Sequence, residues 1–190
     1  MRISNKDIGS YPWYLKPFFN HQKKKYGAVL EPALVWARIP KLFLAVATLY
    51  GVIDRKSSPL SGELRSLITV RVSQINWCAF CVDINSMTLI KRSGSEAKSN
   101  ELEKWQDSKL FSLKEKAALA YAEAITYSGQ NPTNEMFIEL RRHFDEDTII
   151  ELTALIAFQN MSSKFNSALD IAPQGFCAIK KKRGFTNELL

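Results

Sequence analysis

The sequence predicts an all-α protein that folds as a single domain. Apolar residues recur three and four positions apart through most of the 190 residues, which is the spacing of one face of an α-helix. Ser, Thr and Asp residues precede several of these runs, and these residue types are favoured at helix N-termini. A hydrophobic share of 46% with 24% charged residues is typical of a globular domain and excludes disordered, collagenous and fibrous proteins.

Three helices are predicted in the N-terminal part of the chain. The first begins near Pro12 and tolerates Pro17 in its first turn, where proline removes no helical hydrogen bond. The second and third occupy about residues 32–39 and 40–52. The apolar run 42–50 has about half of the roughly 20 residues that a membrane span requires, so we expect a core helix and no membrane partner.

Two further helices are predicted in the middle of the chain. Ser61 precedes apolar residues that keep helical spacing as far as Ile75. The run 68–72 alternates and is β-branched, which also fits a strand, but the flanking period and the lack of a hairpin partner favour a helix. The next helix occupies residues 78–92 and ends before Gly94.

The second half of the chain also has helical signals. Residues 95–109 predict short helices joined by a turn. Ser112 and Glu115 form a capping box that opens a helix to about residue 127, and residues 131–143 predict another helix.

The last predicted helix begins at the acidic residues 145–147 and reaches toward residue 169. Its apolar residues cover most of its circumference. Such a helix must be buried on several sides, so we expect the protein to form a homo-oligomer.

The net charge of +7 is located at the two ends of the chain. Residues 1–30 carry a net charge of +5 and residues 173–190 carry +3, so the remaining 142 residues are at −1. Short basic runs at termini, here 23–25 and 180–183, are typical of solvated tails. The basic ends are the only feature that favours nucleic-acid binding, and we do not expect such binding.

The N-terminus lacks the apolar stretch of a secretory signal, so we expect a cytoplasmic protein. Three cysteines in a reducing compartment disfavour a structural disulfide framework. Cys78 and Cys81 are nevertheless one helical turn apart, at the start of a predicted helix. Unpaired N–H groups there depress the pKa of a thiol, and the resulting thiolate attacks a peroxide or exchanges with a disulfide.

Three other interpretations of the two cysteines remain open. A zinc site needs four ligands, and only Cys177, His21 and His143 remain, at distant positions, so we expect no metal and no cofactor. A thioredoxin-type site requires a strand before the motif. Buried cysteines can also be plain small hydrophobes. A redox dithiol is the leading hypothesis.

Several motifs occur in an order that resembles the carboxymuconolactone decarboxylase superfamily, and within it the alkylhydroperoxidase D (AhpD)-like branch. They are found at residues 60–68, 76–81, 94, 112–119 and 165–171. The resemblance covers about residues 30–172. It divides the chain into an N-terminal helical extension (1–30), an AhpD-like domain (31–172) and a basic C-terminal tail (173–190).

The resemblance implies an AhpD-like helical bundle that forms trimers or hexamers and reduces peroxides with its dithiol. It also implies that Cys81 attacks the peroxide and that Cys78 resolves the product. The helix dipole alone favours whichever cysteine is nearer the helix start, which is Cys78 on this prediction.

Two positions depart from the family pattern. The family has a glutamate at the position of Ser66 and a histidine at the position of Asn85, and both belong to its proton relay. Neither serine nor asparagine titrates near neutral pH, so acid–base help worth about 10² to 10⁴ in rate is lost. Glu63, one turn from Ser66, is a candidate substitute, although an acid is also favoured there by the helix N-terminus alone. Asp83 is a poorer candidate because it faces away from Cys81.

These observations predict a thiol-dependent peroxidase or disulfide oxidoreductase for antioxidant defence, with a weakened proton relay. Its partners would be a small peroxide or disulfide substrate and a thiol reductant. The alternative is a catalytically degenerate family member that serves as an oligomeric binding or redox-sensing scaffold.

Overall fold

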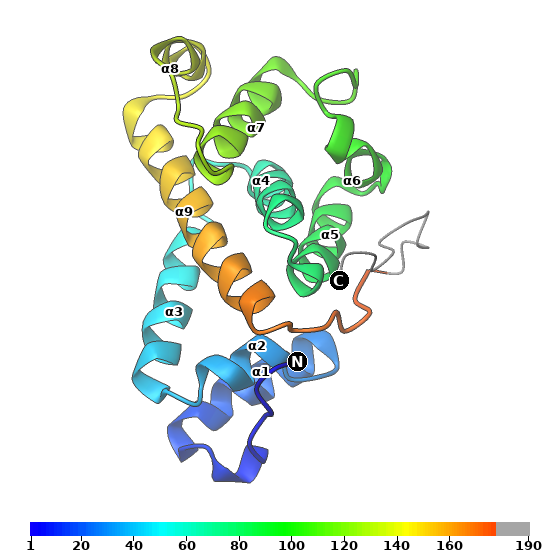
Figure 1. The fold of residues 1–190 in the computed structure, drawn as a ribbon, viewed down its shortest axis with the longest axis vertical. Coiled ribbons are helices and arrows are strands. Elements are labelled where there is room, and N and C mark those ends of the chain that lie inside the picture. Colours follow the sequence, from blue (N-terminus) through cyan, green and yellow to red (C-terminus); the bar gives the residue numbers. More distant parts are fainter. Residues whose placement is uncertain (178–190) are drawn as a thin grey trace.

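A computed structural model of the protein describes residues 1–177, which fold into α-helices and short 3₁₀ helices without any strand (Figure 1). The prediction of an all-α fold is confirmed, and the ambiguous run 68–72 lies inside a helix. The α-helices are α1 (Lys16–Tyr26), α2 (Glu31–Trp36), α3 (Pro40–Ile53), α4 (Gly62–Ile75), α5 (Ala79–Ser93), α6 (Ala97–Glu101), α7 (Leu113–Thr126), α8 (Asn134–Arg141) and α9 (Glu146–Ala168). The 3₁₀ helices are Ile8–Ser10, Trp13–Leu15 and Leu102–Lys104.

Helix α4 is the centre of the molecule and packs against α5, α7 and α9. It begins at Ser61, whose hydroxyl accepts a hydrogen bond from the Leu64 N–H at 3.1 Å, as the sequence predicts. The turn to α5 is very short. Trp77 adopts a left-handed backbone conformation there (φ 54°), and the Cys78 N–H donates to the Ser73 carbonyl at 3.1 Å. The two helices are therefore antiparallel neighbours.

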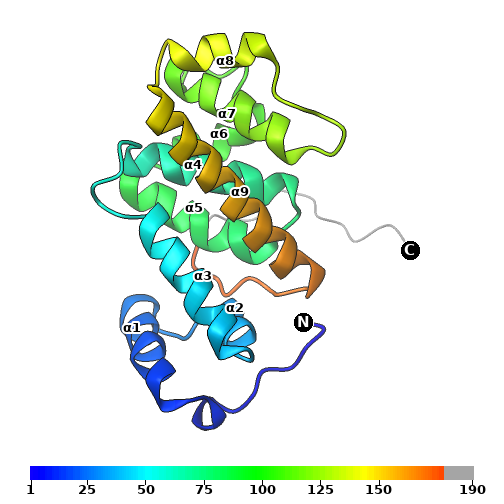
Figure 2. The same ribbon diagram turned by 90° about the vertical axis from the view of Figure 1, so that its left-hand side faces the viewer.

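Helix α9 crosses the molecule beside α4 and α7, as Figures 1 and 2 show from two sides. It starts at Asp145, whose carboxylate accepts from the Thr148 N–H at 2.7 Å. One side of α9 is buried in the core, whereas Ile150 is 65% exposed and Met161 41% exposed. A single chain thus leaves part of its apolar circumference uncovered.

The predicted N-terminal extension packs on the domain. Leu15 and Phe19 are fully buried in a cluster that includes residues of α2 and α3. Trp36 of α2 stacks on Phe165 of α9, with ring centroids 3.6 Å apart. The first three helices therefore form one end of the molecule, next to the C-terminal turn of α9 (Figure 2).

Residues 173–177, the first part of the predicted C-terminal tail, lie against the domain. This segment passes between α5 and the α1–α2 end of the molecule (Figure 1). Its backbone N–H groups donate to the buried carboxylate of Asp83 on α5. The segment packs on the domain because its N–H groups bind the Asp83 carboxylate. The basic run 180–183 lies outside the described residues.

No helix within residues 1–177 combines the length and the apolar character that crossing a membrane would require.

Candidate functional site

Cys78 and Cys81 form a disulfide at the N-terminus of α5, with their Cα atoms 5.2 Å apart. Cys78 is the N-cap residue, and its Sγ accepts a hydrogen bond from the Cys81 N–H at 3.2 Å. The prediction that the helix starts at Cys78 is confirmed. Because an N–H at a helix N-terminus points at this sulfur, the local backbone favours a thiolate there in the reduced protein.

The disulfide is buried. Cys78 is 1% exposed and Cys81 is 3% exposed. Their cluster of buried residues also contains Val35 of α2, Phe80 of α5 and Ile171 after α9. The partly buried side chains around it are Leu30, Ile84, Phe165, Leu169 and Phe176. A substrate therefore reaches the sulfur atoms only when part of this apolar cover moves.

Residues 171–177, here called the C-terminal strap, supply much of that cover. Asp83, which is 9% exposed, accepts hydrogen bonds from the N–H groups of Gln174 (3.0 Å), Phe176 (3.0 Å) and Cys177 (2.7 Å). The Phe176 ring packs edge to face on Phe80, with centroids 6.4 Å apart. Asp83 thus holds the strap in place.

The strap is also fastened to the N-terminal end of the molecule. The Gln174 side chain accepts from the Glu31 N–H at 3.0 Å and donates to the Val29 carbonyl at 3.3 Å. Phe176 also packs on Tyr26 of α1. Elements from both ends of the chain therefore meet over the disulfide.

Asn166, in the last turn of α9, touches the disulfide directly. Its Nδ2 donates to the Cys81 Sγ at 3.2 Å, and the side chain is 2% exposed. Its Oδ1 is buried and has no hydrogen-bond partner among residues 1–177. Sequence reasoning matched this residue to a family motif but gave it no role.

Two of the proposed relay positions are occupied with other partners. The Ser66 hydroxyl accepts from Arg92 at 3.0 Å, in the last turn of α5, whereas the cysteines lie at its start. Glu63 forms an ion pair with Lys98 at 2.8 Å. No described contact joins Ser66 or Glu63 to the cysteines.

Lys98 connects three helices, because it also pairs with Glu115 of α7 at 2.6 Å. Partial burial lowers the pKa of Lys98, but the hydrogen bonds to Glu115 and Glu63 outweigh it, so the pKa is raised. Glu63 therefore has a structural partner that explains its position without catalysis.

Asn85 lies one turn after Cys81 and belongs to a network of neutral polar groups. Its Nδ2 donates to the Ser73 hydroxyl at 3.3 Å, and Gln159 of α9 donates to the same oxygen at 3.0 Å. Nearby, Asn76 donates to Ser163 at 2.9 Å. None of these groups titrates near neutral pH, so the network orders α4, α5 and α9 but supplies no acid or base.

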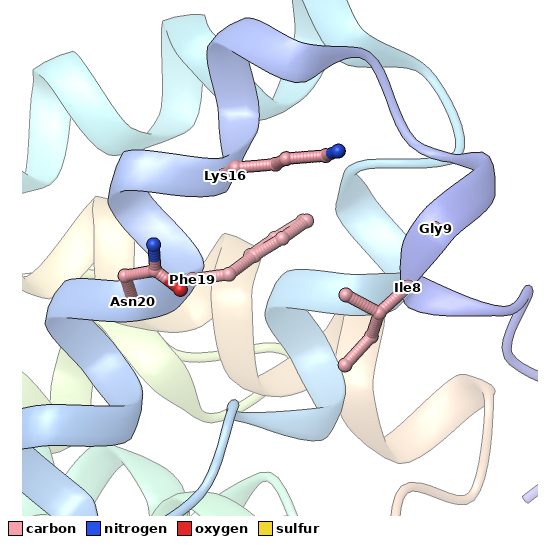
Figure 3. Close-up of a pocket in the computed structure, with 5 residues that line it drawn as sticks. All are labelled: Ile8, Gly9, Lys16, Phe19 and Asn20. Atoms are coloured by element: carbon pink, nitrogen blue, oxygen red, sulfur yellow. The ribbon is translucent and has the colours of Figure 1, made fainter.

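Two surface hollows are found away from the cysteines. One, of about 240 Å³, is lined by the five residues drawn in Figure 3: Ile8, Gly9, Lys16, Phe19 and Asn20. The other, of about 390 Å³, is lined by Pro59, Ser61, Leu64, Lys98, Ser112, Lys114 and Glu115. Neither hollow is lined by Cys78 or Cys81.

Within residues 1–177, no group of three or more His, Cys, Asp or Glu side chains is placed to hold a metal ion. His143 contacts Glu139 at 3.2 Å at the end of α8. Cys177 lies in the strap, where its N–H binds Asp83.

Comparisons with known proteins place the chain in a family. The model of the carboxymuconolactone decarboxylase family matches residues 40–124. The uncharacterized protein YnjA of Escherichia coli K12 is 42% identical over 176 residues, which are 93% of this chain and 97% of YnjA.

Two solved structures extend the comparison to the fold. The debrominase Bmp8 is 26% identical with a TM-score of 0.80, over 90% of this chain and 91% of its own. An uncharacterized peroxidase-related protein from Ralstonia eutropha JMP134, described as an alkylhydroperoxidase AhpD core, has a TM-score of 0.83. The match covers 90% of this chain and 91% of the Ralstonia chain. At 20% identity, that likeness shows a shared fold. The family match, the YnjA relative and the fold together show that the chain belongs to the carboxymuconolactone decarboxylase family, in its AhpD-like branch.

Proposed function

We propose that the protein is a thiol-dependent peroxidase in which Cys78 and Cys81 cycle between dithiol and disulfide. The observation that carries this proposal is the Cys78–Cys81 disulfide at the N-terminus of α5, with one N–H donor on each sulfur. Membership in the AhpD-like branch supports the same chemistry.

The reaction begins with the Cys81 thiolate, which attacks the terminal oxygen of a hydroperoxide. The O–O bond breaks, Cys81 becomes a sulfenic acid, and the alkoxide leaves and takes a proton to give an alcohol. The Cys78 thiolate then attacks the Cys81 sulfur, so that the S–S bond forms and hydroxide leaves, to be protonated to water. A thiol reductant restores the dithiol by disulfide exchange, and the same step would let the protein reduce a disulfide substrate.

The absence of a titrating relay among the described residues near the dithiol lowers the expected rate. Ser66 and Asn85 cannot donate or accept a proton near neutral pH. The leaving oxygen must then be protonated by water or by the Cys78 thiol. We expect the turnover rate to be about 10² to 10⁴ times lower than that of a family member with the full relay.

The test is consumption of hydrogen peroxide and an alkyl hydroperoxide by Cys81→Ser and Cys78→Ser, with Cys177→Ser as the matched control. We expect Cys81→Ser to abolish consumption, Cys78→Ser to stop after one turnover, and the control to match the wild type. Unchanged turnover in Cys81→Ser would refute the proposal. Because Bmp8 is a debrominase and one of its cysteine-to-alanine variants was solved with 2,3,4-tribromopyrrole, that compound is a further substrate to assay.

The burial of both sulfur atoms favours a second candidate function, a redox-sensing or binding scaffold. Such a protein would need no fast reaction with peroxide. Titration of the reduced thiols separates the two: pKa values near 8.5 for both cysteines support the scaffold, and a lowered value supports the enzyme.

We also propose that the protein acts as a homo-oligomer in the cytoplasm. Helix α3 presents Leu42, Leu49 and Val52 on one exposed stripe, with exposed fractions of 40%, 45% and 54%. A second copy of the chain would cover this apolar face and the exposed Ile150 and Met161 of α9.

A further inference from the structure

We propose that Asn166 is a catalytic residue whose amide holds the Cys81 sulfur with its N–H and the hydroperoxide O–H with its carbonyl oxygen. This inference rests on the proposed function and adds a residue to the same site. Ser66 and Asn85 are at the family's relay positions and Glu63 is the candidate substitute, and Asn166 is none of these residues.

The first part of the argument is the contact between Asn166 and Cys81. The two residues are 85 positions apart, and the Asn166 Nδ2 lies 3.2 Å from the Cys81 Sγ in a site that solvent does not reach. A hydrogen bond to a charged acceptor is stronger than one to a neutral acceptor, especially in an apolar environment. The amide therefore favours the thiolate of Cys81 over its thiol.

The second part is the unpaired oxygen of the same amide. Buried polar atoms are nearly always hydrogen-bonded, and the Asn166 Oδ1 has no such partner within residues 1–177. The Oδ1 is bonded to the same planar amide carbon as the Nδ2 that contacts the sulfur, so it is in the same small region of the site. A hydroperoxide that donates its O–H to this Oδ1 brings its terminal oxygen next to the Cys81 Sγ, where it is attacked.

The third part is the division of donors between the two sulfur atoms. Cys78 receives an N–H from the backbone of α5, and Cys81 receives one from Asn166. The helix end alone would favour Cys78 as the thiolate. Asn166 gives Cys81 a donor of its own at the same distance of 3.2 Å, so the helix end does not decide alone which sulfur is the thiolate.

Asn166 is held in place by its surroundings. Its backbone carbonyl accepts from the Ile171 N–H at 3.0 Å, and the preceding Phe165 stacks on Trp36. These contacts hold the backbone that carries the amide, which limits the cost of ordering it during the reaction.

The test compares Asn166→Leu with wild type, both in a Cys78→Ser, Cys177→Ser background, where Cys81 is the remaining thiol. Ionisation of Cys81 is followed by the ultraviolet absorbance of the thiolate, which needs neither turnover nor access to the site. We expect Cys81 to become a weaker acid by about ten- to hundredfold, the size of one charged hydrogen bond. The second-order rate of oxidation by an alkyl hydroperoxide should fall by at least the same factor.

The matched control is Asn160→Leu, a half-buried amide on α9 that donates to Thr126 and the Ile156 carbonyl, not to sulfur. It should destabilise the fold without changing the Cys81 titration. Should Asn166→Leu fail to fold, Asn166→Asp keeps the shape, replaces the donor with a carboxylate, and should weaken the acidity of Cys81 further.

A Cys81 titration in the folded Asn166 variants that equals that of the wild type would overturn the proposal. If the full-length wild type consumes no hydroperoxide while the titration shifts as expected, the proposed function fails but Asn166 still stabilises the thiolate. If turnover proceeds and Asn166→Leu leaves both titration and oxidation rate unchanged, the assignment of Asn166 alone fails.

Discussion

Asn85 is the residue at which the proton relay can be restored with one substitution. It lies one turn after Cys81, at the family's histidine position, and its amide contacts Ser73. Asn85→His places a group that titrates near neutral pH next to the attacking thiol. We expect kcat/KM for hydroperoxide to rise about tenfold or more, and its pH profile to acquire a new step near pH 6 to 7.

Ser66→Ala is the control for Asn85→His. It removes the hydrogen bond from Arg92 and touches nothing at the dithiol. Its kcat/KM and pH profile should match those of the wild type. A loss of activity in Ser66→Ala as large as the gain in Asn85→His would show that Ser66 acts in the reaction despite its distance along α5.

The role of a residue could be predicted from the sequence where it depends on neighbouring residues in the chain. Cys78 is the N-cap of α5 because the residues around it end one helix and start the next, and that pattern is visible in the chain. The role of Asn166 depends on a contact across 85 residues, which spacing cannot reveal. The only signal was its place in a family motif.

At the scale of elements, the C-terminal strap packs over the dithiol and is held there by Asp83. Asp83→Ala removes the acceptor of three backbone N–H groups and should weaken the closed position of the strap. We expect a phosphine reductant to reduce the Cys78–Cys81 disulfide about tenfold faster or more, if one net hydrogen bond of about 1.4 kcal/mol is lost from the closed state. Thiol release followed over time measures this rate.

Asp107→Asn, a change at an exposed aspartate outside the strap, is the control and should leave the reduction rate unaltered. Equal reduction rates in Asp83→Ala and the wild type would mean that reductant reaches the disulfide by another route.

Glu151 fastens α9 to the loop after α3 and makes stability depend on pH. Burial raises the pKa of the Glu151 carboxyl, but hydrogen bonds from Arg55 and Ser58 outweigh it, so the folded pKa lies below the ordinary value of 4.5. Stabilisation from this contact is complete above about pH 4.5 and is lost as pH falls through the folded pKa. We expect Glu151→Gln to lower the free energy of unfolding by up to about 1 kcal/mol at pH 7, because the pair is partly exposed.

That difference should shrink below pH 4.5 and vanish once the wild-type carboxyl is protonated. Urea unfolding of both proteins at several pH values measures it. A difference that stays constant down to pH 2 would contradict the assignment to the charged carboxylate.

The elements themselves were predictable because their ends carry local signals. Ser61, Ser112 and Asp145 each cap a helix with their own side chains, and the capping box of Ser112 and Glu115 is present. The contact of residues 173–177 with the domain could not be predicted, because their acceptor, Asp83, is 91 residues or more away from them in sequence.

At the scale of the whole molecule, the exposed stripe on α3 predicts self-association. The chain mass is 21.6 kDa, and light scattering should give a multiple of that value for the wild type. Leu49→Glu places a charge in the stripe, so we expect the measured mass to fall toward that of one chain. Asn100→Glu, at an exposed site on α6, adds the same charge and should leave the mass unchanged.

A wild-type protein that is monomeric at micromolar concentration would refute this prediction. Periodicity identified the apolar circumference of α9, and the structure shows which part of it stays exposed in one chain. The number of copies depends on geometry between chains, which neither the sequence nor one chain contains.

The cover over the disulfide also has a consequence for the lifetime of the oxidised protein. With both sulfur atoms at most 3% exposed, a reductant must wait for the strap to open. At high reductant concentration the rate of reduction then reaches a plateau equal to the opening rate, as in hydrogen exchange limited by opening. In the proposed reaction cycle, the oxidised state would last for a time set by the rate at which the strap opens, even after the peroxide is consumed.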